Sequence, residues 1–332
     1  MKIFVSGATG YIGLNLVRYL AGSGHQVMAL YRSDSKKELL SVPGVIPVKG
    51  DILDYQSLLS ALSGCEQAYH VAAFAGVWTP DPYSVYKTTV LGSLNVIRAA
   101  RENNVKRVVL TSTAGILGPT IDRDYTDEEV PDPASFFSDY ESAKFILENT
   151  IRTWKQQEPE IVLVNPTRVY GPGLLSESNG VTRMIMQYVR GKWKVIPGNG
   201  KSIGNYVFID DVVMGHVLAM EHGNPGERYL LGGENASYNQ FFETLKSVSG
   251  IRKKLWHVPV SISLLLAKLM LFLARNFGSK PLIVPGLVKK FSLNWIVSSE
   301  KAEKQLNYRI TPLSEGMKKT LLWLRDSGKI HD

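Results

Sequence analysis

The feature that most constrains the fold of this 332-residue chain is the segment VSGATGYIGLNLV, residues 5–17. Its glycines stand at positions 7, 10 and 13, after an apolar run and before a helical pattern of apolar residues. Gly7 can adopt a backbone conformation that a side chain would forbid. Gly13 lets the first turn of the helix lie against the strand. The spacing therefore predicts a tight turn that leads from a strand into a helix.

This turn is also suited to an anion. The free N–H groups and the positive dipole end of the helix favour negative charge, and Gly10 leaves the backbone bare where a ligand must approach. A dinucleotide pyrophosphate is the usual occupant of such a strand–turn–helix. The alternative is a tight turn that holds no ligand.

Strand-like runs alternate with helical patterns along the first half of the chain. Strands are predicted at 2–6, 26–31, 45–48, 67–72, 106–112 and 161–165, and helices near 11–23, 55–63, 82–103 and 139–157. This alternation predicts an α/β fold with a Rossmann-type doubly wound parallel sheet, covered by helices on both faces.

Farther along, a strand at 205–209 and a helix at 210–222 are expected to return to the sheet. We therefore expect a nucleotide-binding domain over 1–168, to which 205–232 return. A smaller C-terminal substrate-binding region is expected over 169–204 and 233–332.

Composition limits the partners and the compartment. Cys65 is the single cysteine, so an intrachain disulfide is excluded and a cytoplasmic location is expected. The net charge of +8 arises in residues 251–332, which hold 15 Lys and Arg against 5 Asp and Glu. No nucleic-acid-binding motif accompanies this charge, so nucleic acid is not expected. A solvated basic face is the favoured explanation, and a membrane surface or an acidic substrate is the alternative.

The end of the second predicted strand indicates which cofactor is bound. A carboxylate at this place would bind the ribose 2′-hydroxyl of NAD, but the chain has Tyr31 and then Arg32, with Lys36 close behind. Cations attract a 2′-phosphate, which favours NADP(H) over NAD(H). An ordinary basic loop is the alternative.

Two further motifs carry reactive side chains. In YESAK, Tyr140 and Lys144 stand four residues apart, which places them side by side on one helix face. A nearby ammonium is expected to lower the tyrosine pKa and so to suit it to acid–base work. Thr111, Ser112 and Thr113 follow a predicted strand, where parallel α/β folds bind their ligands. His, Asp and Glu show no metal-ligand spacing, and no metal is expected.

Taken together, the motifs resemble the extended short-chain dehydrogenase/reductase family of the NAD-dependent epimerase/dehydratase type. The segment HVAAFAGVWTPDP further resembles the branch with dihydroflavonol reductases, 3β-hydroxysteroid dehydrogenases and hopanoid-associated sugar epimerases. The matching segments, in order, are GATGYIG, GDILD (50–54), HVAA (70–73), TSTAGILG (111–118), YESAK, NPTRVYGPG (165–173) and YVFIDDV (206–212).

The resemblance implies a role for each matching residue. Tyr140 would be the general acid/base, Lys144 its partner and a ligand of the nicotinamide ribose, and Thr113 would replace the usual catalytic serine. Thr89 stands where the family usually has asparagine, which leaves a proton-relay or helix-kink role open. With the two cations above, the expected cofactor-binding residues are Gly7, Thr9, Gly10, Tyr11, Ile12, Arg32, Lys36, Asp51, Ile52, Val71, Ala72, Ala73, Thr111, Tyr140, Lys144, Pro166 and Val169.

The expected reaction is hydride transfer between NADPH and a carbonyl carbon, with Tyr140 protonating the developing alkoxide. Apolar residues expected near the pocket favour an apolar small-molecule substrate. The substrate candidates are Phe74, Trp78, Thr113, Phe137 and Met184, with Phe136 and Met186 nearby. Arg168, Arg183 and Lys201 keep a sugar-nucleotide epimerase or dehydratase with a tightly held cofactor as the alternative. A third hypothesis is an NADP-sensing binding protein without turnover.

Two helices bear on assembly. The resemblance implies a homodimer through helices 82–103 and 139–157, since family members pair these helices. In residues 261–277, Ser261, Lys268 and Arg275 form one narrow polar stripe on an otherwise apolar helix. The favoured expectation is that the protein's own C-terminal core covers this helix. The alternative is a hydrophobic lid that touches a membrane surface.

Overall fold

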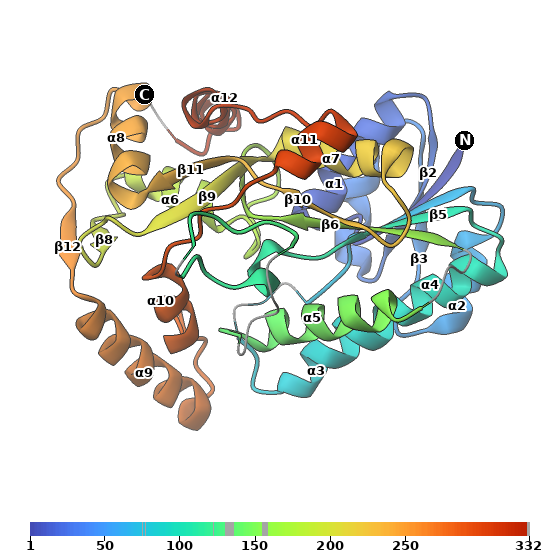
Figure 1. The fold of residues 1–332 in the computed structure, drawn as a ribbon, viewed down its shortest axis with the longest axis horizontal. Coiled ribbons are helices and arrows are strands. Elements are labelled where there is room, and N and C mark those ends of the chain that lie inside the picture. Colours follow the sequence, from blue (N-terminus) through green and yellow to red (C-terminus); the bar gives the residue numbers. More distant parts are fainter. Residues whose placement is uncertain (75, 77, 122, 130–135, 155–158, 331–332) are drawn as a thin grey trace.

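The computed structural model describes residues 1–332 except 75, 77, 122, 130–135, 155–158 and 331–332. Within them, seven strands form a central sheet in the order β10-β6-β5-β4-β1-β2-β3, and every pairing in it is parallel (Figure 1). The strands are β1 (Lys2–Ser6), β2 (Gln26–Tyr31), β3 (Val45–Lys49), β4 (Gln67–His70), β5 (Arg107–Thr111), β6 (Glu160–Pro166) and β10 (Arg228–Leu231).

Helices cover both faces of this sheet, which confirms the predicted fold (Figure 1). On one face lie α1 (Tyr11–Gly22) and α7 (Ile209–His222). On the other lie α2 (Tyr55–Leu62), α4 (Gly92–Glu102) and α5 (Asp139–Arg152). The strand order reverses between β1 and β4, and ligands bind such folds at this place, beyond the carboxyl ends of the strands.

The helix predicted at 82–103 is interrupted. It consists of α3 (Pro82–Tyr86), one π-helical turn η2 (Lys87–Leu91) and α4. Thr89 is buried in this turn, and its carbonyl accepts a 2.5 Å hydrogen bond from the Ser93 hydroxyl. The helix irregularity is therefore present with threonine at this position.

The strand predicted at 205–209 does not return to the central sheet, and that prediction was wrong. It is β9 (Ile203–Phe208), which pairs with β7 (Arg168–Tyr170) and β11 (Glu234–Ser237) in a second sheet. The reason is that β10 occupies the edge beside β6, with Leu231 opposite Pro166. The helix that follows β9, α7, does pack on the central sheet.

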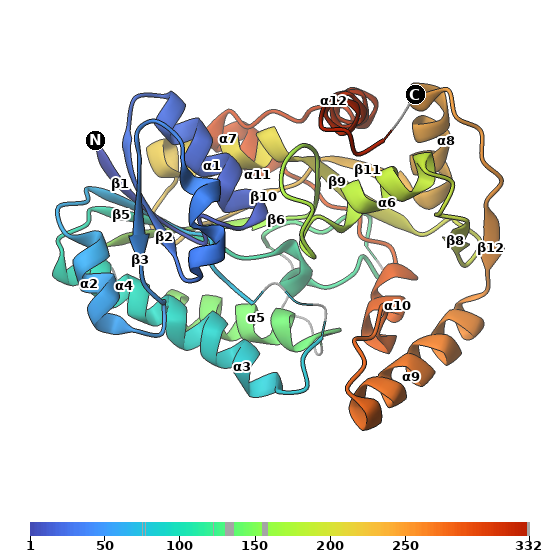
Figure 2. The same ribbon diagram turned by 180° about the vertical axis from the view of Figure 1, so that it is seen from behind.

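The C-terminal region adds short elements around the second sheet. They are α6 (Gly180–Val189), β8 (Val195–Pro197), α8 (Tyr238–Ser249), β12 (Trp256–Val258), α9 (Val260–Phe277), α10 (Pro285–Phe291), α11 (Glu300–Leu306) and α12 (Leu313–Asp326). Figure 2 shows α9 at the periphery, beside α10 and away from the central sheet.

The helix α9 is not covered by the C-terminal core, so the favoured expectation for it was wrong. Among its residues only Ala267 and Ala274 are buried. These small side chains lie seven apart on one narrow stripe, and α10 packs against the helix. Since α10 has only seven residues, it covers a small part of an 18-residue helix.

Candidate functional site

The glycine turn has the geometry that its spacing predicts. Gly7 has a φ of 69°, and a side-chain Cβ there would lie 2.6 Å from the Ala72 backbone nitrogen. At Gly13 a Cβ would lie 2.2 Å from the Gly7 carbonyl oxygen. The helix α1 begins after Gly10 with no side-chain cap and no acidic residue in its first turn. Its positive end is thus left for an anion, as a dinucleotide pyrophosphate requires.

Most of the predicted cofactor residues lie at one edge of the sheet, because they end or follow a parallel strand, and Lys144 of α5 reaches the same edge through the Thr111 carbonyl. The Tyr11 hydroxyl donates to the Gly171 carbonyl, 3.1 Å away, so this side chain ties the turn to the segment after β7. Buried members are Tyr11, Ile52, Thr111, Lys144 and Pro166, and partly buried ones are Gly7, Thr9, Gly10, Ile12, Asp51, Val71, Ala72, Ala73, Tyr140 and Val169.

At the other end of this edge, Arg32 and Lys36 are exposed. An Arg32 nitrogen lies 3.7 Å from a carboxylate oxygen of Asp51. The acidic residue nearest in sequence, Asp34, accepts a 2.6 Å hydrogen bond from the Lys49 ammonium. Asp34 is thus paired with Lys49. Arg32 and Lys36 follow the end of β2, which is where this kind of fold recognises a ribose 2′-substituent.

A buried histidine that the sequence interpretation did not use supports the centre of the site. His70 contacts the Ser6 hydroxyl through Nδ1 at 2.6 Å and the Ser93 hydroxyl through Nε2 at 2.7 Å. Burial, and secondly the charge of Lys144, lower the pKa of His70 to about 3. This neutral ring links β1, β4 and α4 beneath the turn.

The YESAK motif begins α5. The Lys144 ammonium donates a 2.6 Å hydrogen bond to the Thr111 carbonyl and lies 6.0 Å from the centre of the Tyr140 ring. Burial lowers the pKa of Lys144 to about 8, and the charge of Glu148 opposes this shift.

The predicted lowering of the tyrosine pKa was wrong for the protein as it stands. Burial, and secondly the charge of Glu141, raise the pKa of Tyr140 above its ordinary value. The ammonium donates to a backbone carbonyl, and burial is the largest cause of the shift at the phenol. Tyr140 is therefore protonated near neutral pH, which suits a general acid.

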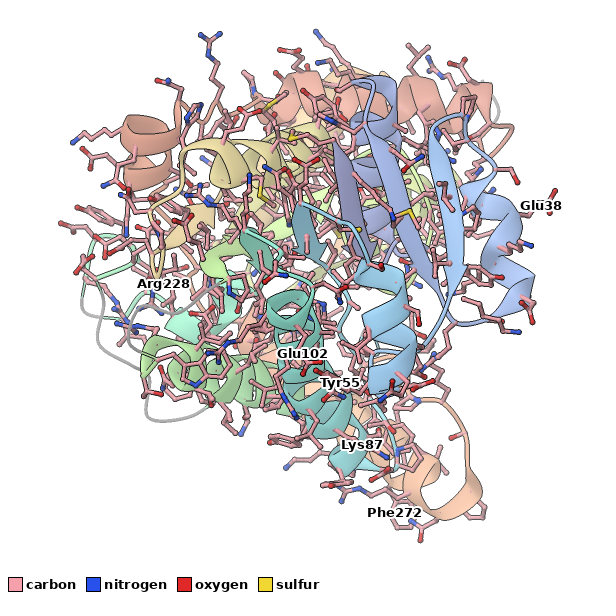
Figure 3. All side chains as sticks on the ribbon, turned by 90° about the vertical axis from the view of Figure 1, so that its right-hand side faces the viewer. Glu38, Tyr55, Lys87, Glu102, Arg228 and Phe272 are labelled. Carbon is pink, nitrogen blue, oxygen red and sulfur yellow. The ribbon has the colours of Figure 1, made fainter. Side chains whose placement is uncertain are left out.

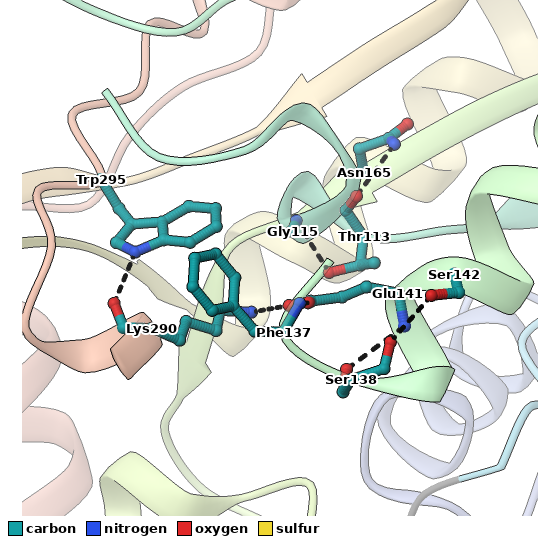
Figure 4. A network of polar contacts seen from close by, with 9 residues as sticks. All are labelled: Thr113, Gly115, Phe137, Ser138, Glu141, Ser142, Asn165, Lys290 and Trp295. Carbon is teal, nitrogen blue, oxygen red and sulfur yellow. Dashed lines mark hydrogen bonds and ion pairs between the residues drawn. The ribbon is translucent and has the colours of Figure 1, made fainter. Parts of the chain in front are cut away.

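Thr113 lies at the end of β5 close to this helix. It caps the turn η3 (Ala114–Leu117), where its hydroxyl accepts a 3.2 Å hydrogen bond from the Gly115 N–H. Its carbonyl accepts from the Asn165 amide, also at 3.2 Å (Figure 4). Thr111 instead shares a 2.8 Å hydrogen bond with His216 through its side chain, so its carbonyl, not its hydroxyl, faces Lys144.

Glu141, beside Tyr140, is a site residue that the sequence interpretation missed. Its carboxylate accepts a 2.9 Å hydrogen bond from the Phe137 N–H and forms an ion pair with Lys290 of α10 (Figure 4). Its own N–H donates to the Ser138 hydroxyl at 3.3 Å. The spacing Ser-x-x-Glu is that of a capping box, and this signal could have identified it.

Glu148, one turn beyond Lys144, is a second missed residue. Its buried carboxylate accepts a 2.7 Å hydrogen bond from Asn165 and lies 3.5 Å from Arg228, which also donates to the Glu128 carbonyl. Burial raises the pKa of Glu148, and its polar and charged neighbours oppose that shift. No local pattern predicts this network, because its members are far apart in the chain.

Of the predicted substrate residues, the aromatic ones pack with neighbouring rings or are partly buried. The Phe137 and Trp295 rings meet edge to face with centroids 6.0 Å apart, and Phe136 packs on Phe145 at 4.9 Å. Phe74 and Trp78 are partly buried in the segment after β4. Met184 and Met186 lie in the main core, each 8% exposed, so a contact between Met184 and substrate stays a prediction.

Metal ligands do not gather in the part of the chain that the structure describes: no group of three or more His, Cys, Asp or Glu side chains there could hold an ion. The described residues provide a glycine turn suited to a pyrophosphate and a phenol with an ammonium 6.0 Å from its ring centre.

Comparisons with known proteins bear on the family and the fold. The sequence model of the NAD-dependent epimerase/dehydratase family matches residues 3–232. A provisionally named dihydroflavonol 4-reductase of Synechocystis sp. is 28% identical, over 98% of this chain and 95% of that protein. Sterol demethylase protein B of Methylococcus capsulatus is also 28% identical, over 99% of this chain and 100% of that protein.

Among solved structures, the UDP-glucose 4-epimerase of Thermotoga maritima, crystallised with UDP-glucose, superposes with a TM-score of 0.81. It is 26% identical to this chain, and the match covers 98% of this chain and 99% of the epimerase.

Proposed function

We propose that this chain, which belongs to the NAD-dependent epimerase/dehydratase family of extended short-chain dehydrogenases/reductases, is an NADP-dependent reductase of an apolar carbonyl compound. Its relatives act on hydroxyl and carbonyl groups, and it is an oxidoreductase of the same type. The observation that carries the proposal is the placement of Tyr140 and Lys144 at the carboxyl edge of the sheet, where the buried ammonium lies 6.0 Å from the centre of the phenol ring.

The chain's own residues perform four tasks in this reaction. The turn at Gly7 to Gly13 would hold the pyrophosphate, and Lys144 would bind the ribose of the nicotinamide half. When bound, the nicotinamide supplies hydride. Tyr140 donates its proton to the alkoxide oxygen that forms as the carbonyl is reduced, and the ammonium one turn away stabilises the resulting phenolate.

The surroundings of three cations favour an apolar substrate over a sugar diphosphate. The Arg168 guanidinium is enclosed by the rings of Tyr206, Tyr238 and Phe291, at 4.9 to 5.8 Å from their centres. Arg183 and Lys201 are exposed. Three rings enclose this guanidinium and limit the approach of a diphosphate, even though its Nη2 has no hydrogen-bond partner among the described residues, whereas Phe137 and Trp295 offer apolar contacts.

The test is consumption of NADPH with a panel of apolar ketones, apolar aldehydes and sugar nucleotides. We expect stoichiometric oxidation of NADPH with members of the first two classes. Conversion of a sugar nucleotide without net loss of cofactor would instead identify an epimerase or dehydratase, and tight NADPH binding with no turnover on the panel would identify a sensor.

Arg32→Asp is expected to reverse the cofactor preference from NADPH to NADH. The exposed guanidinium attracts a 2′-phosphate, whereas a carboxylate repels it and accepts a hydrogen bond from a 2′-hydroxyl. The dissociation constants of both cofactors, measured by fluorescence titration, check this. Equal affinities for NADPH and NADH in the unmodified protein would refute the proposed selectivity.

We also propose a homodimer that pairs α3–α4 and α5 of two copies. Large apolar side chains stand exposed on these helices and on the turn η2 between α3 and α4, namely Tyr83, Leu91 and Ile146. Light scattering at micromolar concentration should give twice the mass of the chain, and Ile146→Glu should give the monomer mass. Leu322→Glu, at an exposed leucine of α12, is the matched control. A monomeric unmodified protein would contradict the assembly.

We further propose that the protein is located in the cytoplasm. The support for this location is a lone, buried thiol at Cys65, whose pKa burial raises to about 11, so the thiol has little thiolate character near neutral pH. Cell fractionation with compartment markers tests this location.

A further inference from the structure

We propose that α9 docks this protein on the surface of an anionic lipid bilayer, with the helix lying along the interface. The proposal starts from exposure. In α9, Leu265 is 69% exposed, Phe272 57% and Phe277 74%. Figure 3 shows Phe272 at the far end of a projection that points away from the body of the molecule.

The exposed apolar side chains form one face. At about 100° per residue, Ile262, Leu265, Leu269, Phe272 and Leu273 fall on the side of the helix opposite the buried Ala267 and Ala274. Polar residues follow one border of this face, where Ser261, Lys268 and Arg275 stand seven apart and are exposed. This is the arrangement of an interfacial helix, whose apolar face enters the acyl boundary while its cations remain among headgroups.

The charge around α9 selects an anionic surface as the occupant. Residues 251–299 contain eight Lys and Arg and no Asp or Glu. Directly before the helix, Trp256 is 57% exposed, and the Lys254 ammonium lies 4.1 Å from the centre of its ring. An exposed tryptophan beside lysine is typical of a membrane–water boundary. A second protein copy, carrying the same cations, would meet like charge here.

The fold requires the helix to lie on the bilayer and not to cross it. By length and composition alone, α9 could span a membrane. However, β12 pairs with β8 just before α9. After it, α10 packs against the site, where Gly286 comes so close to the Phe137 carbonyl that a Cβ would lie 2.1 Å away. Both ends of α9 are thus attached to the same folded body. In addition, the charged Lys268 lies near the middle of the helix, where a spanning helix would place it in the hydrocarbon core.

Docking through α9 would bring the lipid surface to the substrate side of the site. The helix α10 connects the two, since its Lys290 pairs with Glu141 beside Tyr140 and its backbone meets Phe137. An apolar substrate dissolved in the bilayer would then have a short path to the site. This last point depends on the proposed function, whereas docking itself does not.

The test is sedimentation of the full chain with vesicles of phosphatidylglycerol and phosphatidylcholine, or of phosphatidylcholine alone, at low and at physiological ionic strength. We expect the protein to pellet with anionic vesicles, and less so at higher salt. Leu265→Gln/Leu269→Gln/Phe272→Gln should weaken binding by roughly tenfold or more, because the apolar face no longer partitions. Leu322→Gln, on α12, should bind as the unmodified protein does.

A labelled cysteine locates the contact. Because Cys65 is buried, Leu269→Cys supplies an accessible thiol for an environment-sensitive fluorophore, and Leu322→Cys is its control. The emission should shift to the blue with anionic vesicles only at position 269. The proposal is overturned if the unmodified protein stays in the supernatant with anionic vesicles at low salt. It is also overturned if the triple variant binds anionic vesicles as well as the unmodified chain does. A triple variant that halves the mass in light scattering would identify the face as a contact between copies and also overturn it.

Discussion

Tyr140→Phe should lower kcat for carbonyl reduction by about 10²- to 10⁴-fold, the usual loss when one acid–base group is removed. The ring and its contact with the Lys144 ammonium remain, so the dissociation constant for NADPH should change by no more than a few-fold. Burial keeps the pKa of Tyr140 above its ordinary value, and the phenol is therefore the protonated donor over the whole neutral range.

Steady-state kinetics and a fluorescence titration of NADPH separate the two effects. Tyr19→Phe is the matched control, since it removes the same hydroxyl from an exposed tyrosine outside the proposed dimer contact and should leave kcat unchanged. Activity of Tyr140→Phe within a few-fold of the unmodified enzyme would mean that another group, such as Thr113 or a water molecule, supplies the proton.

The second large effect is expected at Glu148. Glu148→Ala should lower the free energy of unfolding by about 3–5 kcal/mol, because it leaves the buried guanidinium of Arg228 without its carboxylate. Glu148→Gln keeps an amide oxygen for Asn165 and should cost less than the alanine variant. Denaturant unfolding measures both, and a loss below 1 kcal/mol for Glu148→Ala would show that the pair is not a structural support.

Glu148→Gln has a second readout, which a purely structural role would not move. The carboxylate favours the ammonium form of Lys144, so its removal should lower the pKa of Lys144 below about 8. Catalysis needs the ammonium, which is lost as the pH rises through that pKa. The alkaline limb of kcat/KM should therefore shift to lower pH in the variant, and an unshifted limb would show that Glu148 does not act on Lys144.

These residues also show how far local patterns reach. The turn at Gly7 and the pair Tyr140–Lys144 were predicted because both patterns are short and each residue's role is set by close neighbours. The partners of the buried carboxylates were not predicted. Glu148 meets Arg228 across 80 positions of sequence, and Glu141 meets Lys290 across 149. Contacts of this kind are fixed by tertiary packing, which a sequence pattern does not encode.

Two errors have the same origin. Residues 205–209 have the apolar pattern of a strand, and they do form one, but the pattern does not say which sheet has a free edge. In α9, the apolar periodicity predicted a helix correctly over 261–277 and its cover incorrectly. The periodicity shows which face of a helix is apolar, but it does not show whether that face packs against protein or against lipid.

The most direct test of the central claim is a single-turnover reaction with NADPH carrying deuterium at the transferable position of the nicotinamide, together with an apolar ketone that the enzyme accepts. The account predicts one deuterium on the former carbonyl carbon of the alcohol, one NADP⁺ per alcohol, and loss of this product in Tyr140→Phe. An alcohol without deuterium, or deuterium found only in an epimerised sugar nucleotide with the cofactor returned to its starting state, would contradict it.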